Sequence, residues 1–293
     1  MDSVLSSIEK FLVCRPLKIS VVWHADGPHV EGYQELIKTW KAKGVNFYER
    51  SGRAGLGFQL ARIFIPKTRN FKTFFKRSHI RKADNFQPLL LEILKSDESE
   101  FLSFNTDDCV FIGEEAFPER AMNHIRKTPD NASYRMFLGS NLDDCPKDIG
   151  TSDGLMFWNY FKDRSEYSWT YPFAIDGTFY DRKSLVKLID KILVHNPITL
   201  EMYLSKYCKK LKLYGNGSSP VISKMTMVPL NKVSHIVPTN RHGCTDVLQL
   251  NKYYLDGYRL ELNIPYSLNK IVYLPDSVTI ARGDDRISLS VVA

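Results

Sequence analysis

The chain has 293 residues, of which 43% are hydrophobic and 25% are charged. This composition is ordinary for a globular protein and argues against a disordered chain, and the length suffices for one large α/β domain. The formal net charge of +7 favours anionic partners, which include nucleotide phosphates, an anionic membrane surface and nucleic acid.

The first fifty residues predict a strand, a helix and a second strand. Residues 18–23 form a compact β-prone run, and a polar loop with glycine and proline follows it. Residues 33–42 carry apolar side chains at helical spacing, and residues 44–48 then predict a second short strand. This order calls for a parallel sheet, in which ligands bind beyond the carboxyl ends of the strands.

A basic and aromatic segment, residues 67–82, follows with the sequence KTRNFKTFFKRSHIRK. It predicts an amphipathic helix whose phenylalanines pack in the core and whose basic residues face water. Three functional alternatives remain open: contact with phosphates, contact with an anionic membrane, and binding to nucleic acid.

The remaining elements follow from periodicity and from helix-breaking residues. We expect helices at residues 86–94, 118–127, 182–193, 199–210 and 248–255, and strands at residues 101–104, 134–138 and 221–228. The last twenty residues, 274–293, predict a strand-rich or loose tail.

Two adjacent acids, Asp107 and Asp108, stand between the strand at 101–104 and a second apolar run at 109–112. Carboxylates at a strand end suit a divalent cation, Mn²⁺ or Mg²⁺, that neutralises a diphosphate and keeps open positions for phosphate oxygens. The alternative is an acidic turn that joins two strands.

The segment Thr106-Asp107-Asp108-Cys109-Val110-Phe111 resembles the x-D-D-x-h-F segment of bacterial and viral GT-A glycosyltransferases of the polysaccharide type. Other pieces occur in the order seen in that family, namely RKADN at 81–85, YPFAIDGTFYDRK at 171–183, NPITLE at 196–201 and VPLNKVSHIVPTNRHG at 228–243. The resemblance spans roughly residues 18–260 and implies an α/β fold with a GT-A-like, Rossmann-type central mixed sheet flanked by helices.

The resemblance also implies a domain organisation. A single GT-A-like catalytic domain would cover residues 1–260, with a nucleotide-sugar-binding half at 18–112 and an acceptor half at 113–260. Residues 261–293 would be a C-terminal tail.

Residue roles come with the resemblance. Asp108 would bind the metal directly, and Asp107 would contact the ribose or act as the second metal-side acid. Residue 106 is Thr, so the motif departs from D-x-D and leaves open which acid binds the metal. His235 is a candidate third metal ligand. Further donor contacts are expected from the loop after the first strand and from the RKADN segment, at His24, Asp26, Arg81, Lys82 and Asp84.

Asp176, within Ile175-Asp176-Gly177-Thr178, is the expected catalytic base. In an inverting transferase a carboxylate takes the proton of the acceptor hydroxyl as that oxygen attacks the anomeric carbon. Two other interpretations stay open: an N-cap or turn residue beside Gly177, and an acceptor-binding residue in a retaining enzyme.

The sequence thus predicts a glycosyltransferase that moves a sugar from a nucleotide-sugar donor to a hydroxyl of a glycan, polysaccharide or lipid-linked acceptor. The alternatives are a basic nucleic-acid-binding protein and a metal-dependent nucleotidyltransferase. Nucleic acid is a less favoured partner than a nucleotide-sugar donor.

The five cysteines include no C-x-x-C pair, which favours a cytoplasmic protein. The sequence also lacks an apolar run of about 18 residues, so we expect a protein that is soluble or at most peripheral to a membrane.

Overall fold

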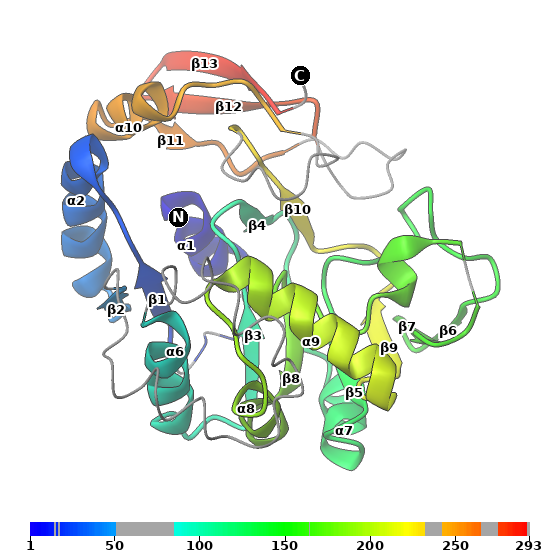
Figure 1. Ribbon diagram of the computed structural model, residues 1–293. Helices are drawn as coiled ribbons and strands as arrows, with labels where there is room; N and C mark the ends of the chain where they lie inside the picture. The colour runs from blue at the N-terminus through cyan, green and yellow to red at the C-terminus, as the bar shows by residue number, and fades with distance from the viewer. Residues whose placement is uncertain are drawn as a thin grey trace.

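The structure is a computed structural model, and it describes residues 1–14, 16, 18–50, 85–163, 165–231, 242–264 and 275–291. Over these residues the protein has seven α-helices and a six-stranded mixed sheet, so the α/β class predicted from the sequence is confirmed (Figure 1). The basic segment at residues 67–82 lies outside the described residues. Within them, no helix combines the length and the apolar character needed to cross a membrane.

The predicted strand, helix and strand at the beginning of the chain are confirmed. They are β1 (Ser20–Trp23), α2 (Val30–Lys41) and β2 (Asn46–Glu49), with the short 3₁₀ helix η1 (Gly27–His29) before α2. β1 and β2 pair in parallel, and Leu36 and Trp40 of α2 pack against Val21 of β1. Among the described residues these two strands form a sheet of their own, separate from the central sheet.

The central sheet has the strand order β3-β8-β5-β9-β7-β6. Its strands are β3 (Phe101–Phe104), β5 (Ala132–Arg135), β6 (Gly150–Ser152), β7 (Leu155–Asn159), β8 (Thr178–Asp181) and β9 (Asn216–Pro220). Only β5 and β9 pair in parallel, and the other neighbours are antiparallel. β3 therefore shares one sheet with strands that come after residue 113, although the predicted boundary between two halves at that point stays a prediction.

Helices cover both faces of the sheet, because the strands alternate their side chains between two cores. In β8, Phe179 packs into the core with α1 (Asp2–Phe11) and α7 (Glu119–Lys127), whereas Tyr180 points into the opposite core. That second core lies under α6 (Phe86–Lys95), α8 (Arg182–Ile189) and α9 (Pro197–Leu211). α9 crosses the sheet in front of β3, β8 and β5 in Figure 1.

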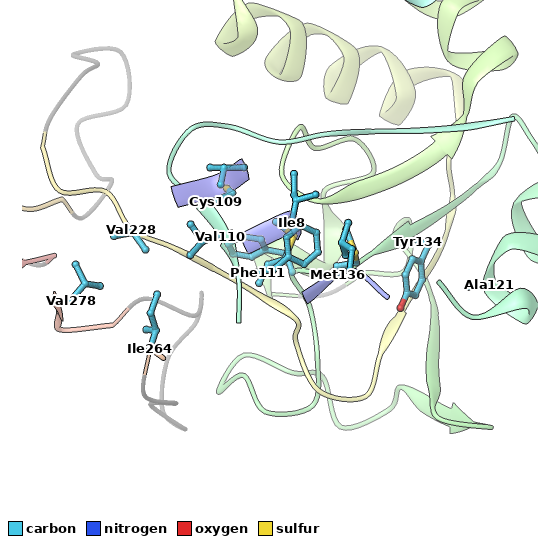
Figure 2. Close-up of a cluster of buried hydrophobic side chains, with 14 of the residues drawn as sticks. Ile8, Cys109, Val110, Phe111, Ala121, Tyr134, Met136, Val228, Ile264 and Val278 are labelled. Atoms are coloured by element: carbon cyan, nitrogen blue, oxygen red, sulfur yellow. The ribbon is translucent and has the colours of Figure 1, made fainter. Parts of the chain in front are cut away.

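The first core is centred on β4 (Cys109–Phe111), the apolar run after the acidic pair. All three of its side chains are at most 1% exposed, and β10 (Met225–Met227) pairs with it in antiparallel fashion. Figure 2 shows Val110 and Phe111 between Ile8 of α1 and Val228, with Val278 and Ile264 beyond.

The C-terminal residues belong to this core as well. β11 (Arg259–Leu260), β12 (Ser277–Arg282) and β13 (Asp285–Ser290) form a three-stranded antiparallel sheet after α10 (Val247–Leu255). Val278, Leu289 and Val291 are buried in the same cluster as β4. The segment is strand-rich, as the sequence predicts, and the domain boundary after residue 260 stays a prediction.

Candidate functional site

The acidic pair lies in a tight turn between β3 and β4. The backbone N–H of Cys109 donates to the carbonyl oxygen of Thr106 over 3.2 Å, which closes the turn. Asp107 is exposed, whereas Asp108 is partly enclosed. The pair is therefore an acidic turn between strands, and it also points one carboxylate outward and one toward the interior.

Asp108 and Asp176 meet at the hydroxyl of Thr106, although 70 residues separate Thr106 from Asp176. The Thr106 Oγ1 lies 2.6 Å from Asp108 Oδ1 and 3.0 Å from Asp176 Oδ1. The Cys109 Sγ lies 2.9 Å from the same hydroxyl and 3.4 Å from Asp176 Oδ1. Because a hydroxyl carries one proton, Thr106 donates to one carboxylate at a time and links the two.

Gly177 determines where Asp176 stands. Its φ of +50° is unfavourable for residues with a side chain, and a Cβ at this position would overlap the Met225 sulfur. The Gly177 N–H donates to the Phe104 carbonyl oxygen over 2.9 Å, which ties Asp176 to the end of β3. Asp181, and not Asp176, caps α8 by accepting from the Ser184 N–H, so Asp176 is not an N-cap; it lies in a bend beside Gly177, as the other half of that interpretation has it.

Burial and the negative charge of Asp176 raise the pKa of Asp108 to about 6. The buried Cys109 thiol has its pKa raised well above the usual range by burial and by Asp176, so it stays protonated. Cys109 therefore serves as a weak donor to Asp176 and not as a nucleophile.

A cavity of about 310 Å³ opens beside Asp107 and Asp108. Four tyrosines also line it, from the beginning of α2, from α10 and from the residue before β11: Tyr33, Tyr253, Tyr254 and Tyr258. Burial, followed by the charge of Asp107, raises the pKa of Tyr33 to about 12, and the Tyr33 ring stacks on Trp23 at 5.4 Å. Rigid aromatic walls with a few polar groups are typical of a site for a small organic ligand.

Asp107 and Asp108 are the metal-ligand candidates that line this cavity. Within the described residues, no three His, Cys, Asp or Glu side chains are grouped closely enough to hold a metal ion by themselves. Two carboxylates fit a hard cation such as Mg²⁺ or Mn²⁺ that takes its other ligands from phosphate oxygens and water.

Of the other residues predicted to contact the donor or the metal, only His24 and Asp26 lie in the described part of the chain. His24 and Asp26 are exposed in the loop after β1, and His24 Nδ1 lies 3.1 Å from the Arg50 carbonyl oxygen. Neither lines the cavity, whereas His29 and Tyr33 a few residues later do. The remaining candidates lie outside the described residues: Arg81, Lys82, Asp84 and His235.

The chain was also compared with known proteins. No protein-family model and no curated protein matches it. Its function is therefore inferred from the site itself.

Sequence reasoning missed two kinds of residue in this site. The tyrosines of α10 and Tyr258 line the cavity, but isolated tyrosines on a helix give no signal of a ligand. Thr106 appeared only as a departure from D-x-D, although its hydroxyl joins the two acids. A short polar residue beside an acidic pair is a signal that could have suggested this role.

Proposed function

We propose that the chain is a metal-assisted glycosyltransferase of the GT-A type, which moves a sugar from a nucleotide-sugar donor to a hydroxyl of a glycan or lipid-linked acceptor. One observation carries the proposal: Asp108, beside an aromatic cavity, is joined through Thr106 to Asp176. A cation-binding acid and a candidate base thus stand together at one edge of an α/β fold.

The cavity is the proposed place of the donor. It lies between the helix that follows β1 and the acidic turn, and ligands of α/β proteins bind beyond the carboxyl ends of such strands. Its tyrosines suit a flat nucleoside, and the carboxylates of Asp107 and Asp108 in its lining could hold the counter-ion of a diphosphate. A bound Mn²⁺ or Mg²⁺ would neutralise the charge that develops on the leaving diphosphate.

Asp176 is the proposed base. The acceptor oxygen forms a bond to the anomeric carbon while the bond from that carbon to the diphosphate oxygen breaks, and the hydroxyl proton moves to the Asp176 carboxylate. Thr106 and Cys109 hold this carboxylate toward Asp108 by hydrogen bonds. A carboxylate fixed in this way is oriented before the acceptor binds.

The test is release of nucleotide from a panel of UDP-, GDP-, dTDP- and CMP-sugars, with Mn²⁺ and a mixture of glycan acceptors. We expect turnover with one donor class, and a loss of at least about a hundredfold in Asp176→Asn, which is the usual contribution of a positioned base. Asp190→Asn is the matched control, because Asp190 is exposed and forms a surface ion pair with Lys95, away from the cavity. Turnover that is equal in all three proteins would contradict the assignment of Asp176.

A nucleotidyltransferase is the second candidate, because paired acids serve the same cation chemistry. It predicts release of pyrophosphate from nucleoside triphosphates, which a pyrophosphate assay on the same proteins measures.

A further inference from the structure

Glu201 lies on α9, and its side chain contacts the loop that carries the candidate base. The way in which the helix begins determines which side of α9 carries Glu201. Asn196 and Thr199 form a capping box, in which each side chain binds the backbone of the other residue. The helix therefore begins at a defined residue, and Leu200 and Leu204 face the core at 2% and 0% exposure. Glu201 follows Leu200 and points to the loop that carries Asp176, because its Oε1 accepts from the Ile175 N–H.

The backbone of that loop, residues 171–177 and here named the Asp176 loop, is bound by side chains from several elements, among them Arg135 of β5, Tyr180 of β8 and Glu201 of α9. Arg135 of β5 is buried and donates from Nη1 to the carbonyl oxygens of Ser168 and Tyr171, over 3.0 and 3.1 Å. The Tyr180 hydroxyl binds both the N–H and the carbonyl oxygen of Ala174.

Glu201 completes this set at the residue before Asp176. Its Oε1 accepts the backbone N–H of Ile175 over 3.3 Å. Arg135 holds the loop at its beginning and Tyr180 holds its middle, and Glu201 restrains the backbone at the residue before Asp176, whose carboxylate Thr106 and Cys109 hold.

A neutral glutamine would accept the same hydrogen bond without a titratable group in the interior. The presence of a buried carboxyl group at this position therefore calls for an explanation. Burial, and then the charge of Asp176, raise the pKa of Glu201 to about 7, which means that ionisation here is unfavourable. The positive charge of Arg135 and the hydrogen bond from Ile175 oppose that rise in part. Buried charges of this kind are weak contributors to stability, and they are typical of functional sites.

We propose that Glu201 is a positioning residue of this site, which holds the Asp176 loop through its hydrogen bond to the Ile175 N–H so that Asp176 stays against Thr106 and Asp108. The catalytic consequence rests on the proposed function, whereas the effect on the loop does not.

The test compares Glu201→Ala and Glu201→Gln with the wild-type chain by amide hydrogen exchange of peptides that cover residues 172–178. We expect exchange about tenfold faster in Glu201→Ala and a smaller increase in Glu201→Gln, because glutamine still accepts from Ile175. Glu119→Ala, on the exposed surface of α7, is the control and should leave these peptides unchanged. Unchanged exchange in Glu201→Ala, or an equal rise in the α7 peptides, would overturn the proposal.

Turnover of the same variants separates this proposal from the proposed function. Where wild-type turnover is present, Glu201→Ala should lower kcat and leave the KM for the donor unchanged, because Glu201 does not line the cavity. An absence of wild-type turnover with every donor would count against the transferase, and the exchange result would still decide the role of Glu201.

Discussion

Asp108→Asn is expected to make the metal-free protein more stable at neutral pH. Asparagine keeps the size of the side chain and an oxygen that accepts from Thr106, and it removes the charge. The pKa of Asp108 rises from 3.8 to about 6 on folding, so the native chain keeps a proton that the unfolded chain releases. The protonated Asp108 therefore adds to the free energy of unfolding. This contribution is fully present below about pH 4 and is lost as the pH rises through about 6.

The shift amounts to about two pKa units, which corresponds to about 3 kcal/mol. Urea denaturation of both proteins in a chelating buffer measures the difference. Asp108→Asn should be about 3 kcal/mol more stable than the wild type at pH 7.5 and no more stable at pH 3.5. Asp190→Asn, an exposed site, is the control and should change stability at neither pH. Equal stability at pH 7.5, or the same gain at both pH values, would refute the idea that a buried, repelled carboxylate destabilises the fold here.

Three other substitutions test the geometry. Thr106→Val removes the hydroxyl that both acids share and should cost about 1 to 3 kcal/mol by urea denaturation, whereas Thr106→Ser should recover most of it. Gly177→Ala should cost at least about 1 kcal/mol in the same assay, because φ is +50° and the added Cβ overlaps Met225, so an unchanged midpoint would contradict the structure. Tyr180→Phe leaves the N–H and carbonyl oxygen of Ala174 without their buried partner and should lower stability by about 1 to 3 kcal/mol in thermal unfolding; a neutral effect would mean that water replaces the hydroxyl.

Local signals in the sequence predicted much of the fold. The β-branched run of β1 and the apolar spacing of α2 identified the opening unit, and Asn196-Pro197 marked the break before α9. The strand β9, with the sequence NGSSP, was missed because it has no β-branched or aromatic residue. It is a strand because it pairs on both sides inside the sheet, which is a tertiary effect that local propensity does not carry.

The candidate site was only partly predictable for the same reason. Asp108 and Asp176 were each singled out from their local sequence and from the resemblance to GT-A enzymes. Their meeting at Thr106 depends on the antiparallel pairing of β3 with β8, which places Gly177 beside Phe104. The role of Glu201 depends on where α9 crosses the sheet, and no spacing in the sequence reports that.

The donor site is the central claim, and ligand-induced thermal stability tests it most directly. The midpoint of unfolding is measured with UDP, GDP, CMP and dTDP, each with and without Mn²⁺, for the wild type and for Asp108→Ala. The proposed site predicts a rise with one nucleotide that requires Mn²⁺ and disappears in Asp108→Ala, because the acid pair links the cation to the diphosphate. No rise with any nucleotide, or a rise that persists in Asp108→Ala, would contradict it.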